Sequence, residues 1–154
     1  MPTCNQIMTP DPDFCLCSTP VAEVAKLMKS KNIGAVPVLD SEDDRRLVGI
    51  VTDRDLVLNA MAAGRDVNAT CAEQVMSPRP RTCSPADDIA TAIEIMETNQ
   101  VRRLPIVDQY GKLVGIISQA DVAIRMSKTK KAGELLQEIS KPEIINRQLR
   151  RRAS

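Results

Sequence analysis

Two short stretches place a hydroxyl side chain three residues before a carboxylate, at Thr52 and Asp55 and again at Ser118 and Asp121. Each pair lies between two apolar runs, the pattern of a turn from a strand into a helix. At such a turn the pair can form a capping box, with Asp in place of the usual Glu. Alternatively, the carboxylate can accept hydrogen bonds from a ribose diol, and the free N–H groups at the helix end favour phosphate. The spacing alone favours the cap, and the two uses can coexist.

The basic residues around the two turns differ. Arg54 lies within the first stretch, where the second has Ala120, and Arg103 precedes the second hairpin at the position that Ala35 takes in the first copy. We therefore expect the two turns to be inequivalent as anion sites. A solvent-facing strand end is the competing interpretation of Arg103. Whether Arg54 and Arg103 face one cleft or two is left open by the sequence.

A glycine stands three residues before each hydroxyl, at Gly49 and Gly115. A glycine inside a strand often marks a place where another group approaches the backbone closely. We expect these two positions to admit a ligand.

The chain has no histidine, and therefore lacks the usual general base and the commonest neutral metal ligand. Its cysteines are odd in number, contain no C-x-x-C pair and match no zinc or disulfide framework; they are Cys4, Cys15, Cys17, Cys71 and Cys83. We interpret them as small buried hydrophobes in a reducing cytosol, with a redox or metal element at Cys15 and Cys17 as the alternative. We expect no catalytic residues, no metal site and no required cofactor, so the chain is not expected to be an enzyme.

Phe14 and Tyr110 are the only aromatic residues among 154. A planar ligand would therefore have to lie between aliphatic side chains, and a stacking platform for single-stranded nucleic acid is not expected. The first 13 residues have neither an apolar core nor a basic start, and no apolar run approaches the length of a membrane span. We expect a cytoplasmic protein with no membrane or nucleic-acid partner.

The sequence repeats itself. The segment at Ile7 and Met8 returns at Val75 and Met76 with an offset of 68 residues, and Pro37 returns at Pro105 with the same offset. Beyond residues 40 and 108 the offset becomes 66, which is a two-residue deletion in a turn, the kind of change that surface loops tolerate. A register held over about fifty residues is a strong signal of a tandem repeat.

Each repeat is predicted to run strand, helix, strand, strand, helix. The expected helices have apolar positions at i, i+3, i+4 and i+7, and the expected hairpins are pairs of apolar runs around a polar turn. In the first copy these segments are 14–17, a helix from Pro20 that Gly34 ends, Ala35–Leu39, Leu47–Thr52, and a closing helix over 53–63 with Leu56, Val57 and Ala60 inward. In the second they are a helix through Ile89, Ala92, Ile93 and Met96, then Arg103–Val107, Leu113–Ser118 and a closing helix over 119–127.

This organisation predicts three parts: a first repeat with its N-terminal segment over 1–66, a second repeat over 67–127, and a basic tail over 128–154. The tail carries eight basic and three acidic residues, which give it a net charge of +5 against −4 for the rest of the chain. A short amphipathic helix over 132–140 is conceivable within it. We interpret the tail as a solvated segment, with contact to an acidic partner or to nucleic acid as the alternative.

The repeat resembles a pair of cystathionine β-synthase (CBS) domains, also called a Bateman module. The resemblance is carried by the Val/Ile-Met-Thr/Ser-Pro repeat starts, by the Ala-Val-Pro-Val and Arg-Leu-Pro-Ile strands, and by the two Gly-x-x-Thr/Ser-x-x-Asp turns. The resemblance covers about residues 5–127, and the chain is similar to the stand-alone bacterial CBS-pair proteins. It implies a mixed α/β fold in which two βαββα repeats pack through their sheets about a pseudo-two-fold axis.

The resemblance also implies a function. CBS pairs bind AMP, ADP, ATP or S-adenosylmethionine between the repeats, form homodimers and regulate a protein partner, whose identity the sequence does not show. Transferred to this chain, the expected ligand-binding residues are Thr52, Arg54, Asp55, Arg103, Ser118 and Asp121. The alternative function is a module for dimerisation and protein interaction that binds no small ligand.

Overall fold

The hairpins that the apolar runs predict are present in both halves of the chain. The computed structural model describes residues 1–137. The first repeat contains α1 (Cys4–Ile7), β1 (Thr9–Pro10), β2 (Cys15–Leu16), α2 (Val21–Lys31), β3 (Ala35–Leu39), β4 (Leu47–Thr52), α3 (Asp53–Asp55) and the π-helix η1 (Leu56–Met61). The second contains α4 (Ala72–Val75), β5 (Ser77–Pro78), α5 (Ile89–Asn99), β6 (Arg103–Val107), β7 (Leu113–Ser118) and α6 (Gln119–Gln137). The mixed α/β fold of two βαββα repeats is thus confirmed.

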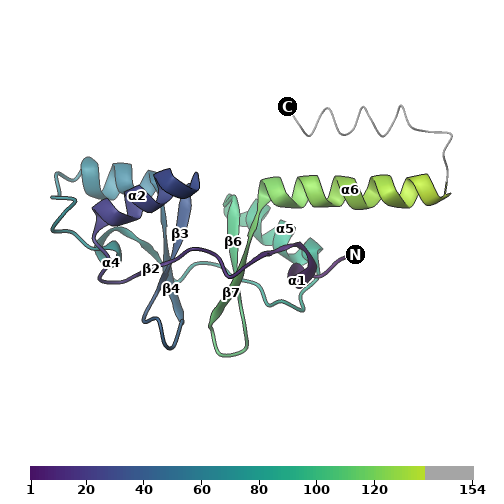
Figure 1. The fold of residues 1–154 in the computed structure, drawn as a ribbon, viewed down its shortest axis with the longest axis horizontal. Coiled ribbons are helices and arrows are strands. Elements are labelled where there is room, and N and C mark those ends of the chain that lie inside the picture. The colour runs from purple at the N-terminus through teal and green to yellow at the C-terminus, as the bar shows by residue number, and fades with distance from the viewer. Residues whose placement is uncertain (138–154) are drawn as a thin grey trace.

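The strands form two sheets that lie side by side (Figure 1). One sheet has the order β2-β3-β4-β5 and the other β1-β7-β6. The short strand β1 at the start of the first repeat pairs with β7 of the second, and β5 at the start of the second repeat pairs with β4 of the first. Each repeat therefore lends its opening segment to the sheet of the other.

The two hydrophobic cores follow the same exchange. Cys4, Ile7 and Met8 pack in the core of the second repeat, beside side chains of α5, β6 and β7. Ala72 and Val75 of α4 pack in the core of the first repeat. Because each core contains a helix of the other repeat, neither repeat can separate without uncovering apolar surface.

The turn ends of the two hairpins also join the repeats. Arg46 and Lys112 form an antiparallel bridge. The N–H of Leu47 donates to the carbonyl of Gly111, and the N–H of Leu113 donates to the carbonyl of Arg45, both at 3.0 Å. These bonds link the two sheets at the turns where the two-residue deletion falls.

Several local expectations were wrong. The first long helix ends at Asn32, whose φ of 54° places it in the left-handed region, and Gly34 does not provide the stop. Asn tolerates that conformation because its short side chain hydrogen-bonds locally. Ala25, which the i, i+3, i+4, i+7 spacing from Val21 predicts to face inward, is exposed.

The closing helices also differ from expectation. In the first repeat the helix becomes the π-helix η1 after one turn, and Val57 is 50% exposed, although Ala60 is buried. In the second repeat α6 continues past Ser127 to Gln137. The remainder of the predicted helix over 132–140, and of the basic tail, lies outside the described residues.

Candidate functional site

At the first turn, Thr52 and Asp55 form a complete capping box. The Thr52 hydroxyl accepts a hydrogen bond from the Asp55 N–H at 3.1 Å, and Asp55 Oδ2 accepts one from the Thr52 N–H at 2.9 Å. The capping interpretation of this turn is therefore confirmed. One of the two carboxylate oxygens is already bound by the turn's own backbone.

Two further side chains contact the Asp55 carboxylate. The hydroxyl of Ser77, on β5 of the other repeat, lies 3.3 Å from Oδ1 and 3.5 Å from Oδ2. The side-chain amide of Asn59 donates to Oδ1 at 3.5 Å and to the Val75 carbonyl at 3.0 Å. Neither residue was predicted. The Ser77 contact joins different repeats and has no local pattern, whereas Asn59 lies four residues after Asp55, a helical i, i+4 spacing that could have indicated it.

The second turn is capped in one direction only. The Ser118 hydroxyl accepts a hydrogen bond from the Asp121 N–H at 3.0 Å. Among residues 1–128, whose side chains the structure describes, no donor contacts the Asp121 carboxylate. At the positions that correspond to Ser77 and Asn59, this turn has Thr9 and Arg125. The Arg125 guanidinium donates to the carbonyls of Gln6, Ile7 and Met8 instead.

Arg103 belongs to the second turn. Its Cα pairs with Ser118 across β6 and β7, and directly opposed residues of two strands have their side chains on the same face. In the first repeat the corresponding partner of Thr52 is Ala35, which is 7% exposed and uncharged. Arg54 is exposed at the first turn. The structure therefore brings Arg103, Ser118 and Asp121 together on one repeat, and Thr52, Arg54 and Asp55 on the other.

The expectation that Gly49 and Gly115 leave space for a ligand is wrong. A Cβ atom at Gly115 would lie 2.2 Å from the sulfur of Met8, and one at Gly49 would lie 2.3 Å from the sulfur of Met76. Each glycine therefore accommodates a methionine that stands just before an exchanged strand. The paired glycines serve the exchange of segments between the repeats.

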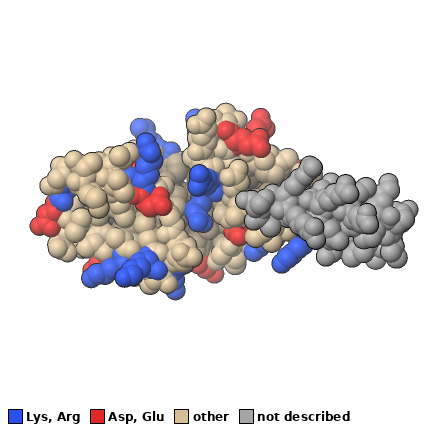
Figure 2. All heavy atoms as spheres, turned by 90° about the horizontal axis from the view of Figure 1, so that it is seen from above, with Lys and Arg blue, Asp and Glu red and all other residues tan. Residues whose placement is uncertain are grey.

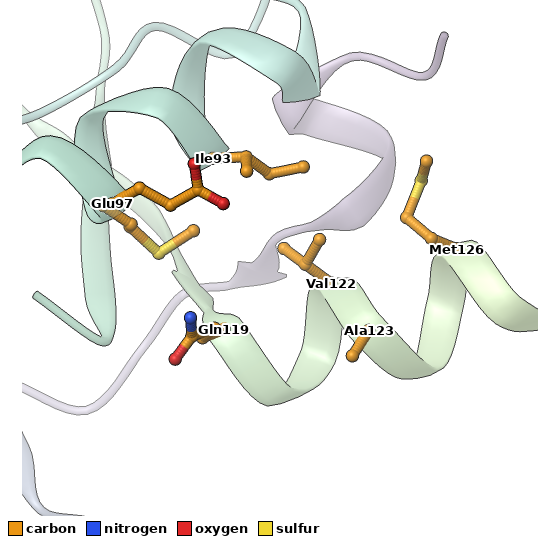
Figure 3. A pocket seen from close by; sticks show the side chains of 7 residues that line it. Ile93, Glu97, Gln119, Val122, Ala123 and Met126 are labelled. Carbon is orange, nitrogen blue, oxygen red and sulfur yellow. The ribbon is translucent and has the colours of Figure 1, made fainter. Parts of the chain in front are cut away.

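An apolar groove of about 260 Å³ lies between α5 and α6 (Figure 3). It is lined by Ile93, Met96, Glu97, Gln119, Val122, Ala123 and Met126. Figure 3 shows Val122 on α6 and Ile93 on α5 on the two sides of this space. None of the six predicted ligand-binding residues lines it, so the groove and the turns are separate features.

On the face shown in Figure 2, Lys and Arg side chains form separate groups with Asp and Glu side chains between them. The cysteines meet the expectation of buried thiols only in part, because Cys4, Cys15 and Cys83 are buried whereas Cys17 and Cys71 are half-buried. Burial raises the pKa of the Cys15 thiol to about 12, and burial together with nearby Cys4 and Asp87 does the same for Cys83. Because only the thiolate is a good nucleophile or ligand, the raised pKa disfavours reaction of these two thiols at neutral pH.

Neither a metal cluster nor a membrane span is found in the part of the chain that the structure describes. No group of three or more His, Cys, Asp or Glu residues there could hold a metal ion. No described helix combines the length and the apolar character that crossing a bilayer demands.

The comparisons with known proteins agree with this architecture. The family model of the CBS domain matches residues 4–61 and again residues 72–128. The CBS domain-containing protein YhcV of Bacillus subtilis is 40% identical over 124 residues, which are 80% of this chain and 85% of YhcV.

Two solved structures have the same fold. Hypoxic Response Protein I, crystallised with two coordinated zinc ions, has a TM-score of 0.72 and 33% identity, and the match covers 79% of this chain and 97% of that protein. CBSX2 of Arabidopsis thaliana in complex with AMP has a TM-score of 0.74 and 27% identity, and the match covers 84% of this chain and 99% of that protein.

Proposed function

The chain belongs to the CBS domain family as a tandem pair, and from that premise we propose that it is a regulatory module that binds an adenosyl nucleotide between its repeats and modulates a protein partner in trans. The candidate ligands are AMP, ADP, ATP and S-adenosylmethionine. The observation that carries this proposal is the second turn, where Arg103, Ser118 and Asp121 lie on one repeat and no described group contacts the Asp121 carboxylate.

The chemistry of this turn suits the two ends of a nucleotide. A carboxylate is an acceptor only, so Asp121 can accept both hydrogen bonds of a ribose diol. Arg103 presents a planar, permanently charged guanidinium, which suits the oxygens of a phosphate. The AMP complex of CBSX2 supports a nucleotide as the ligand class. The chain's two aromatic residues leave adenine to be held between aliphatic side chains.

We also propose that the functional unit is a homodimer. Large apolar side chains are exposed on the closing helices, with Val57 at 50%, Leu58 at 46% and Met61 at 73% on η1, and Ile124 at 54% on α6. A second copy of the chain that covers these residues would remove this apolar surface from water.

We also propose a cytoplasmic location and a role without catalysis. All five cysteines are free, which is consistent with a reducing cytoplasm. The absence of histidine from the whole sequence and the raised pKa values of the buried thiols favour a role without catalysis.

A ligand-free interaction module is the second candidate. The specific observation in its favour is the first turn, where the chain's own Thr52, Asn59 and Ser77 bind the Asp55 carboxylate. If the second turn were equally unable to bind a nucleotide, the exposed apolar helices would remain as the functional surface.

Thermal unfolding with AMP, ADP, ATP and S-adenosylmethionine separates the two candidates. A ligand at 100 times its Kd stabilises the folded state by about 2.7 kcal/mol, which at this chain length raises the Tm by roughly 5–10 °C. We expect at least one of the four to produce that rise. No shift with any of them at millimolar concentration would leave the interaction module as the function.

A further inference from the structure

The two acidic turns differ in what already binds their carboxylates. Asp55 accepts hydrogen bonds from the Thr52 N–H at 2.9 Å, from the Ser77 hydroxyl at 3.3 and 3.5 Å, and from the Asn59 amide at 3.5 Å. A carboxylate has about four acceptor positions. The three donors on Asp55 therefore leave about one free position, whereas a ribose diol needs two.

The bond between Ser77 and Asp55 crosses from one repeat to the other. Ser77 lies on β5, which the second repeat lends to the first sheet, and it pairs with Ile50 two residues before Thr52. Asp55 lies in the first turn of the closing helix of the first repeat, at the end of α3. The contact thus joins the exchanged strand β5 to the helix that follows β4, in addition to the two short ladder pairs of β5.

The second turn has no such bond. Thr9 occupies the position of Ser77 on the exchanged strand β1, but no hydrogen bond joins its side chain to Asp121 within the described residues. Arg125 takes the position of Asn59, and its guanidinium binds carbonyls of the N-terminal segment rather than the carboxylate. Two corresponding turns therefore differ: the chain's own donors bind the Asp55 carboxylate, and no described donor binds that of Asp121.

We propose that Asp55 is a positioning residue, which fastens the exchanged strand β5 through Ser77, and that the chain binds one nucleotide, at Asp121. The stoichiometry rests on the proposed nucleotide-binding function, whereas the fastening role of Asp55 does not. The uncharged Ala35 opposite Thr52 supports the same division, because the strand beside the first turn supplies no cation where Arg103 stands at the second. The cation of the first turn, Arg54, lies on the helix side and is exposed.

A charged residue stands two positions after Ser77 and two positions after Thr9. Arg79 and Asp11 occupy the same register after the shared proline and carry opposite charges, but both lie away from the turns. Since β5 and β1 run antiparallel to their partners, Arg79 reaches the level of Val48 and Asp11 that of Val114, where their N–H groups donate to those carbonyls. Their charges therefore do not reverse the difference between the turns.

Isothermal titration of the full chain with AMP, ADP, ATP and S-adenosylmethionine tests the stoichiometry. We expect one nucleotide per chain. For whichever of the four binds wild type, Asp121→Asn should raise the Kd about ten- to a hundredfold, the loss expected for hydrogen bonds to a charged group. Asp55→Asn should change the Kd less than about threefold, since each 1.4 kcal/mol is tenfold in Kd and no ribose bond is lost. Two nucleotides per chain, or a tenfold loss in Asp55→Asn, would overturn the assignment.

Ser77→Ala tests the fastening role without any ligand, with Thr9→Ala as the matched control at the other turn. We expect Ser77→Ala to lower the Tm by about 2–4 °C and to speed hydrogen exchange around β5, and Thr9→Ala to change neither, because only Ser77 binds a carboxylate. Equal behaviour of the two variants would refute the role of Asp55. If none of the four ligands binds wild type, the proposed function and the ribose role of Asp121 both fail, and this pair of variants still decides the role of Asp55.

Discussion

Replacing Gly115 by alanine tests the contact that holds the exchanged N-terminal segment in place. The new methyl group would lie 2.2 Å from the sulfur of Met8, 2.8 Å from its Cγ and 3.2 Å from its Cβ. A change of rotamer can move the sulfur, but it cannot move the Cβ, which belongs to the backbone of the segment. Met8 is buried in the core of the second repeat, so it has no open space to enter. The segment must therefore shift away from β7.

Overpacking of this kind destabilises a protein by about 1–3 kcal/mol. For a chain of this length each kcal/mol lowers the Tm by about 2–4 °C, so Gly115→Ala should lower the Tm by about 2–12 °C. Urea denaturation gives the free energy directly, provided that the slope of the transition stays unchanged. Gly49→Ala should behave alike, since the added Cβ would lie 2.3 Å from the sulfur of Met76.

Two further variants make the result specific. Gly34→Ala is the matched control, because its Cβ would meet only the carboxylate end of the exposed Asp53 side chain at 3.1 Å, and its Tm should not fall. In a Met8→Ala background the methyl at position 115 has room, so the two substitutions should couple by about 0.5–3 kcal/mol. The reasoning is refuted if Gly115→Ala is as stable as wild type, or if its effect is the same with and without Met8.

Three other predictions concern separate parts of the molecule. Arg125→Ala removes the guanidinium that binds three carbonyls at the start of the chain, so urea denaturation should show a loss of about 1.5–3 kcal/mol; unchanged hydrogen exchange over residues 4–10 would contradict this. Burial raises the pKa of the Cys15 and Cys83 thiols to about 12, so both stay protonated at pH 8 and become thiolates only as the pH approaches 12. A disulfide reagent should therefore modify them at pH 8 only after denaturation. Rapid reaction in the folded protein would contradict this prediction. Leu58→Glu and Met61→Glu should convert the proposed dimer into a monomer in light scattering, because each buries a charge in an apolar contact, and a dimer that survives both would place the interface elsewhere.

Much of the fold could be predicted from the sequence because the information is local. The strands Ala35–Leu39 and Leu47–Thr52 have the bounds that their apolar runs indicate, and the second copy repeats them at a fixed offset. The capping box at Thr52 and Asp55 is likewise a pattern of neighbours.

The exchange of segments between the repeats could not be predicted in this way. Pairing of Thr9 with Ile116 joins residues more than a hundred positions apart, and nothing in either short segment specifies its partner. One signal is present in the sequence: Met8 and Met76 stand at corresponding positions of the two repeats, as do Gly49 and Gly115, which fits a methionine packed on a glycine in each half. The bond from Ser77 to Asp55 depends on that exchange and was hidden with it.

The most direct test is to titrate the protein with AMP and to monitor the backbone amide NMR signal of each residue. If a nucleotide binds at the second turn, the largest shifts should occur at Arg103 and from Ser118 to Asp121, and the shifts at Thr52 and Asp55 should be small. These shifts should be lost in Asp121→Asn, which would assign the nucleotide to the second turn. Shifts centred on Ile93 and Val122 of the apolar groove, or none with AMP, ADP, ATP or S-adenosylmethionine at millimolar concentration, would contradict the central claim.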